Sequence, residues 1–125
     1  MGVDAISIEV FKNLFISICE EMGVALQRTS YSPNIKERRD CSVAIFDTFG
    51  NMVALSAIAP MHLSSLLGMV RNITERHPLE SLKPGDTFLT NDPYVGGGSH
   101  LPDLTLMSPV FFEGQVVAFV ANLAH

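Results

Sequence analysis

Cysteines and basic residues are both scarce in this sequence. Only two of the 125 residues are cysteines, and eight Lys and Arg residues stand against thirteen acidic ones. Cys19 and Cys41 are too few and too far apart to suggest a disulfide framework or a close metal-binding pair, which favours a reducing cytoplasm. A formal net charge of −5 leaves no basic surface to neutralise phosphates, so we expect no nucleic acid as a partner.

Long apolar runs and a signal sequence are also missing. No apolar stretch approaches the roughly 18–20 residues that a membrane-spanning helix needs. The first residues lack the basic start and continuous apolar run of a signal peptide. We therefore expect neither a membrane partner nor export. The hydrophobic content of 47% is typical of a globular core, and no linker divides residues 1–125 into two domains.

Two segments have the hydrophobic period of a helix. In residues 6–27 and 62–76, apolar positions recur every three or four residues, so each predicts an amphipathic helix. We expect Phe11, Phe15 and Met22 on the first helix to pack in the core. Pro33 should keep the chain after that helix in a structured loop.

The remaining segments predict strands. Residues 41–46 and 52–56 are β-prone and flank a Gly-Asn turn, which predicts a hairpin. Residues 87–90, 104–112 and 115–122 predict three more strands. The expected fold class is α+β, with two main helices packed on a mostly antiparallel sheet. Because the chain stops within a β-run at His125, we expect it to be part of a larger domain.

Residues 90–103 hold the densest group of unusual side chains. Gly96 and its glycine neighbours allow sharp turns, and Asp92, His100 and Asp103 lie close together in sequence. Imidazole and carboxylate are the ligands of Zn²⁺, Mn²⁺ and Fe²⁺ sites, and His125 follows a strand that can return to the same place. An ordinary turn explains the same pattern about equally well. A phosphate-binding loop is disfavoured, because no Lys follows the glycines.

Three stretches resemble a known family. They are Tyr31-Ser32-Pro33-Asn34-Ile35-Lys36-Glu37-Arg38-Arg39-Asp40-Cys41-Ser42, Asn91-Asp92-Pro93-Tyr94 and His100-Leu101-Pro102-Asp103. With these residues the chain resembles the start of the hydantoinase B family. That family includes N-methylhydantoinase B subunits, the carboxyl-terminal half of ATP-hydrolysing 5-oxoprolinases and a subunit of acetone carboxylases. Members are much longer, so the resemblance identifies an amino-terminal fragment.

The resemblance implies a hydrolase that opens a cyclic amide C–N bond. A hydantoinase A-type partner subunit would use ATP, and the B-type part would complete the reaction at a divalent metal, Zn, Mn or Fe. The implied metal ligands are Asp40, His100, His125 and Asp103, while Asp103 and Asp92 are the candidates for proton transfer. The segment alone should be inactive. Two alternatives stay open: an acetone carboxylase-type subunit, and a non-catalytic segment whose long helix contacts the partner subunit.

Other chemically capable side chains have simpler interpretations. His62, at the start of the second helix, can line the site, but we expect a capping or surface role. His77, at the end of that helix, is expected to be structural. Cys19 and Cys41 are expected to be small core residues and not nucleophiles.

Overall fold

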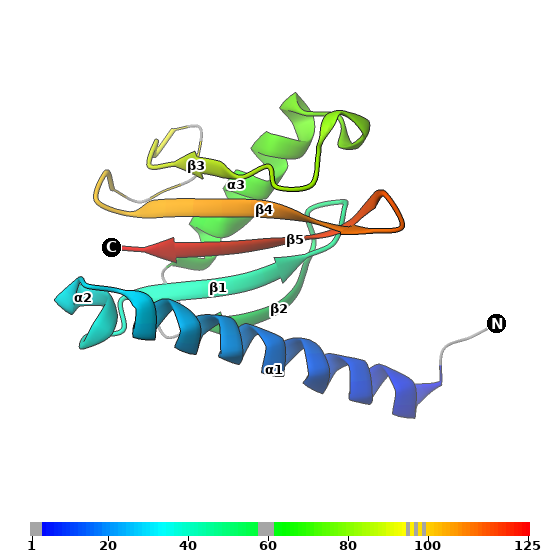
Figure 1. Ribbon diagram of the computed structural model, residues 1–125, viewed down its shortest axis with the longest axis horizontal. Helices are drawn as coiled ribbons and strands as arrows, with labels where there is room; N and C mark the ends of the chain where they lie inside the picture. Colours follow the sequence, from blue (N-terminus) through cyan, green and yellow to red (C-terminus); the bar gives the residue numbers. More distant parts are fainter. Residues whose placement is uncertain (1–3, 58–61, 95, 97, 99) are drawn as a thin grey trace.

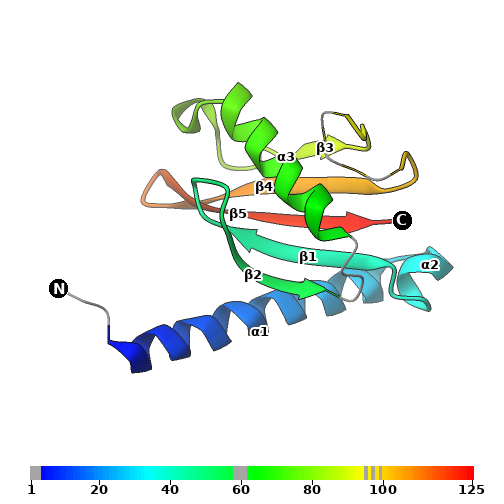
Figure 2. The ribbon, with the colours of Figure 1, turned by 180° about the vertical axis from the view of Figure 1, so that it is seen from behind.

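Five strands form one antiparallel sheet between two long helices. The computed structural model describes residues 4–57, 62–94, 96, 98 and 100–125. The strands are arranged in the order β2-β1-β5-β4-β3. Their bounds are Cys41–Phe46 (β1), Met52–Ala57 (β2), Phe88–Thr90 (β3), Leu104–Phe112 (β4) and Gln115–Ala124 (β5). Helices α1 (Ala5–Thr29) and α3 (Leu63–Arg76) lie on opposite faces of this sheet, as Figures 1 and 2 show.

The predicted α+β fold class and both main helices are confirmed. All strand pairs are antiparallel, and the predicted hairpin of β1 and β2 is present. The loop predicted after α1 contains a short helix, α2 (Pro33–Lys36), and a 3₁₀ turn, η2 (Leu79–Ser81), follows α3. Pro33 occupies the first turn of α2, where its missing N–H costs nothing. In the described part of the chain, no helix is long and apolar enough to cross a membrane.

Side chains alternate between the two faces of the sheet and build two apolar clusters. Because successive strand residues point to opposite faces, Phe46 and Phe119 face α3, whereas Val43 and Ile45 face α1. The larger cluster lies under α3. Its fully buried members are Ala44, Phe46, Leu66, Met69, Val70, Met107, Phe119, Ala121 and Leu123. This cluster fixes α3 over the centre of the sheet and so fixes the position of its first residues.

Helix α1 buries less of its apolar face than its sequence predicts. The helix lies against the sheet at Gly23, where an added Cβ would lie 3.8 Å from both Val43 and Ser56 side-chain atoms. Toward its amino-terminal end the helix runs away from the strands (Figure 1). Phe11 is 54% exposed, so the prediction that it packs in the core is wrong, while Phe15 and Met22 pack partly against the smaller cluster.

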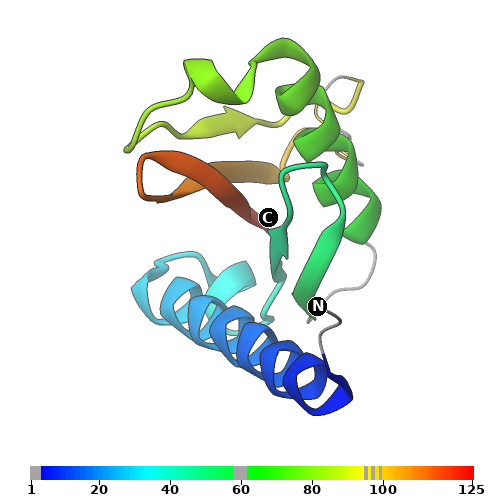
Figure 3. The ribbon, with the colours of Figure 1, turned by 90° about the vertical axis from the view of Figure 1, so that its right-hand side faces the viewer.

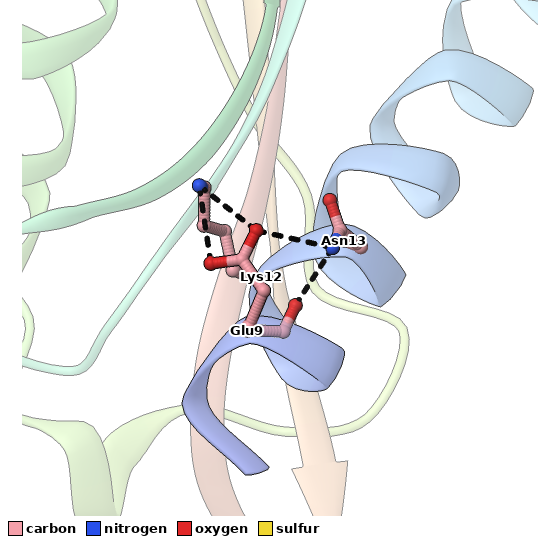
Figure 4. A network of polar contacts seen from close by, with 3 residues as sticks. All are labelled: Glu9, Lys12 and Asn13. Atoms are coloured by element: carbon pink, nitrogen blue, oxygen red, sulfur yellow. Dashed lines mark hydrogen bonds and ion pairs between the residues drawn. The ribbon is translucent and has the colours of Figure 1, made fainter. Parts of the chain in front are cut away.

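The same end of α1 carries a local polar network. Lys12 Nζ lies 3.3 Å from Glu9 Oε1, and the Asn13 amide donates to the Glu9 carbonyl at 2.9 Å (Figure 4). These residues are exposed, and isolated pairs of this kind contribute only a few tenths of a kcal/mol, about 0.3–0.5. The network therefore lies on the surface of α1 and does not attach the helix to the sheet.

Both cysteines are core residues, as predicted. Cys19 is fully buried between α1 and the sheet, and Cys41 is buried at the start of β1. Burial raises the pKa of each thiol above its ordinary value, which disfavours the reactive thiolate. Neither cysteine is suited to act as a nucleophile.

Phe119 provides a test of the core beneath α3. It is the register partner of Phe46 on β1, and both rings are completely buried. Phe119→Ala should lower the free energy of unfolding by about 3–5 kcal/mol, because it removes apolar contacts and leaves a cavity. The matched control is Phe49→Ala, since Phe49 is 84% exposed in the β1–β2 turn. Urea titration should show a change of about 0.5 kcal/mol or less for the control; equal effects of the two variants would contradict this core.

Candidate functional site

Three predicted site residues lie side by side at one end of the sheet, next to the first residues of β1 and β4 and the last residue of β5. Cys41 and Leu104 both pair with Ala124 on β5, so the next positions outward are Asp40, Asp103 and His125. The His125 backbone N–H donates to the Asp40 carbonyl at 3.3 Å, which extends the pairing by that one residue.

Strand alternation also assigns these residues to one face. Asp40 is two residues before Ser42, and His125 is two residues after Leu123, a member of the cluster beneath α3. The three positions therefore share the α3 side of the sheet. Neighbouring positions across antiparallel strands are about 4.5–5.5 Å apart, close enough for their side chains to interact.

His100 contacts Asp103 and lies against the His125 ring. Its Nδ1 lies 3.0 Å from Asp103 Oδ2, and its ring centroid lies 5.3 Å from that of His125 in an edge-on arrangement. Asp103 is 2% exposed, whereas the His100 side chain is 52% exposed. The structure thus brings His100, Asp103 and His125 together, with the His100 ring half exposed and the Asp103 carboxylate buried.

Asn34 joins this cluster from helix α2. Its Nδ2 lies 2.9 Å from Nδ1 of His125, although 91 positions separate the two residues in sequence. The amide nitrogen can only donate, so Nδ1 of His125 accepts here and Nε2 carries the proton of the neutral ring. His125 could bind a metal through Nε2 only if the Asn34 amide turned its oxygen toward Nδ1. The sequence analysis missed Asn34 as a functional candidate. The available signal was its place in the first of the three stretches that resemble the family, six residues before Asp40.

His62 faces Asp40 from the first residue before α3. Its Nε2 lies 3.4 Å from Asp40 Oδ1, and its Nδ1 lies 3.2 Å from the Ser42 hydroxyl oxygen. The side chain makes no capping hydrogen bond to α3 and is 3% exposed. The expected capping or surface role of His62 is therefore wrong. The apolar cluster beneath α3 holds the helix against the sheet and directs the ring inward.

His77 is separate from this group. It lies at the other end of α3, where its ring centroid is 5.0 Å from that of Phe88. This contact supports the structural role predicted for it.

The loop between β3 and β4 brings His100 to the strand ends. The Asn91 amide donates to the Leu101 carbonyl at 3.0 Å and so ties the two sides of the loop together. Asp92 Oδ1 accepts a hydrogen bond of 2.8 Å from the Tyr94 backbone, which gives this carboxylate a role in the turn. Gly96 packs closely, since an added Cβ would lie 2.5 Å from Thr90 Cγ2. The other predicted loop residues, Val95, Gly97 and Ser99, lie outside the described residues.

The imidazole nitrogens and carboxylate oxygens of these residues are of the kinds that bind divalent metals. Nδ1 of His100 faces the Asp103 carboxylate, which is how protein metal sites orient histidine ligands. A second imidazole, His125, and a second carboxylate, Asp40, occupy neighbouring positions. Across the described ranges, no three His, Cys, Asp or Glu side chains already converge as a metal-binding group. Binding would therefore require these side chains to change rotamer around the ion.

Comparison with known proteins matches the whole chain to a family. Residues 4–125 match the family described as hydantoinase B/oxoprolinase. The chain is 45% identical to 5-oxoprolinase 1 from Arabidopsis thaliana over 122 residues, which cover 98% of this chain and 10% of that protein. The structure of ATP-dependent caprolactamase from Pseudomonas jessenii gives a TM-score of 0.84 at 27% identity and covers 100% of this chain and 21% of the other.

A more distant structure shares the fold. An acetone carboxylase gives a TM-score of 0.79 at 18% identity, covering 94% of this chain and 16% of that one. The chain spans about a tenth to a fifth of the length of the curated relatives it matches. The family match covers nearly every residue, including Asp40, His100, Asp103 and His125. The chain belongs to the hydantoinase B/oxoprolinase family.

Proposed function

We propose that this chain contributes a divalent-metal site to an ATP-dependent enzyme that opens a cyclic amide. The observation that carries this proposal is the alignment of Asp40, His125 and Asp103 across three neighbouring strands, with His100 above them. Carboxylate and imidazole donors together suit Zn²⁺, Mn²⁺ or Fe²⁺. The ATP would be used by a hydantoinase A-type partner subunit.

A metal held by Asp40, His100, His125 and Asp103 would lower the pKa of a water molecule and polarise the amide carbonyl. The protein side chains have separate tasks. Asp103, through its Oδ2 contact with Nδ1 of His100, orients that ring. Asn34 fixes the orientation of the His125 ring, and its amide would turn its oxygen to Nδ1 when His125 binds the metal through Nε2. Asp92 or Asp103 is proposed to take the proton from the attacking water, Asp103 only where it does not itself bind the metal.

The relatives favour a cyclic amide over other substrates. The proteins named 5-oxoprolinase and caprolactamase match nearly the whole chain at 45% and 27% identity. The acetone carboxylase, at 18% identity, supports a common fold only. Hydrolysis of a cyclic amide is therefore preferred to carboxylation. A cytoplasmic location is part of the proposal, because Cys19 and Cys41 are both free thiols.

The metal content of the purified native protein tests the site. Elemental analysis should find a stoichiometric divalent metal in the wild type, and His100→Ala and Asp40→Ala should each lose it. The matched control is His77→Ala, because His77 lies at the far end of α3 and should not affect the metal. All variants should first be shown to keep wild-type circular dichroism.

Two results would contradict this assignment. A wild-type protein without metal would remove the proposed chemistry, and a metal that survives both ligand variants would show that it is bound elsewhere. Loss of metal in His77→Ala as well would point to a general loss of structure.

A second function, contact with the partner subunit, is favoured by the exposed apolar face of α1. Ile8, Phe11 and Leu14 are each 50–56% exposed, although their spacing places them along one side of the helix. Large apolar side chains arranged in this way commonly mark an interface. We propose that this face contacts the hydantoinase A-type subunit, a role compatible with the metal site at the opposite end of α1.

Charge placed on this face should weaken subunit association. Phe11→Glu should reduce co-purification of the ATP-binding subunit and raise the dissociation constant at least about tenfold, because aromatic anchors often contribute 2 kcal/mol or more. Lys12→Ala is the matched control, since its side chain is 59% exposed and belongs to the polar network. Analytical ultracentrifugation of the mixed subunits measures the effect; equal association of wild type and Phe11→Glu would exclude this face as the contact.

A further inference from the structure

His62 is a buried polar side chain that the proposed function does not use. Its ring is 3% exposed although it immediately precedes helix α3, a position where a polar side chain usually faces solvent or caps the helix. Burying a polar ring is unfavourable unless both of its nitrogens find partners. The packing of α3 that encloses His62 is therefore tolerated only because of what the two nitrogens contact.

Both nitrogens of His62 face groups from the start of strand β1. Nδ1 lies 3.2 Å from the Ser42 hydroxyl oxygen, and Nε2 lies 3.4 Å from Asp40 Oδ1. A carboxylate can only accept, so the nitrogen beside Asp40 must carry a proton. In the neutral ring Nδ1 then accepts, and Ser42 donates its hydroxyl proton to it. Ser42 thus donates to Nδ1, and the protonated Nε2 faces the Asp40 carboxylate at 3.4 Å.

The packing of α3 on the sheet holds His62 in place between Ser42 and Asp40. Asp40 and Ser42 are two residues apart and point to the α3 side of the sheet, while α3 is fixed there by Leu66, Met69 and Val70. Ser42 is 2% exposed, so its hydroxyl is held within packed structure. The His62 ring is thus held between β1 and α3, which the larger apolar cluster packs together.

The same three residue types also form hydrolytic triads, but this arrangement differs from one. In a triad the nucleophilic serine faces Nε2 and the carboxylate faces Nδ1. Here the positions are reversed, and Ser42 is buried where no substrate carbonyl can reach it. A nucleophilic role for Ser42 is therefore excluded. What remains is an effect on Asp40, whose side chain is 35% exposed and can present its carboxylate to a ligand.

We propose that His62 is a positioning residue that holds the Asp40 carboxylate in the orientation needed to bind the metal, with Ser42 fixing the tautomer of the ring. The inference rests on the proposed metal site. Partners of this kind typically change metal affinity by 10- to 100-fold when removed. They do so because the ligand otherwise loses the polar contact that sets its orientation.

The test is metal affinity in the purified native protein, measured by chelator competition with Mn²⁺ or Co²⁺. His62→Leu fills a similar volume without donors and should weaken binding about 10- to 100-fold. His62→Gln can place an N–H near the position of Nε2 and should restore most of the affinity. Ser42→Ala keeps the ring but frees its tautomer, so it should weaken binding by a smaller factor. His77→Leu is the matched control and should bind as the wild type does.

The absorption spectrum of the Co²⁺-loaded protein adds a second readout. A changed Asp40 orientation should shift the ligand-field bands of His62→Leu and leave those of His62→Gln close to wild type. A purely structural role would lower the melting temperature of both variants without this difference between them. If His62→Leu does not fold, the comparison of Ser42→Ala and His62→Gln with wild type decides the question.

The outcomes separate this inference from the proposed function. If the wild type binds no metal, the proposed function fails and the positioning role fails with it. If the wild type binds metal and His62→Leu and Ser42→Ala bind it as tightly, only the positioning role is overturned. If the affinity falls equally in His62→Leu and His62→Gln, the N–H group is not what supports Asp40, and the inference is also overturned.

Discussion

The register of three antiparallel strands is the constraint on which the site depends. Pairing of β1 and β4 with β5 sets Asp40 and Asp103 on either side of His125. Because side chains alternate along a strand, a slip of one residue in either pairing would turn one carboxylate to the α1 face. The buried pair Phe46 and Phe119 opposes such a slip, since it would carry a large ring out of the core. Hydrophobic packing at the centre of the sheet thus determines where Asp40, Asp103 and His125 lie at its end.

Sequence patterns were sufficient for the elements but not for the contacts between them. The helical period of residues 6–27 and 62–76 and the Gly-Asn turn after Phe46 each depend on near neighbours, and the structure confirms all three. The contacts of His62 with Ser42 and of Asn34 with His125 span 20 and 91 positions. Neither contact leaves a periodic signal. Asp40 itself was found only through the resemblance to the family.

The two misjudged residues share one physical cause. A hydrophobic period shows that a helix has an apolar face, but it does not show what covers that face. Phe11 was expected in the core, yet α1 contacts the sheet chiefly around Cys19 and Gly23, which leaves Phe11 half exposed. His62 was expected at the surface, yet packing of α3 encloses it (Figure 3 shows the two helices on their separate faces). Both outcomes follow from how whole elements dock, a property of tertiary packing that local patterns do not determine.

The polar end of the sheet also has an energetic consequence under the proposed function. Asp103 is almost completely buried, and Asp40 lies on the other side of His125 on the same face. Buried carboxylates cost free energy unless cations and hydrogen bonds compensate them. A divalent cation would offset this cost and would bind the folded state alone. Its binding would then stabilise this edge by mass action, so the same residues that perform the chemistry would couple metal loading to the order of the strand ends.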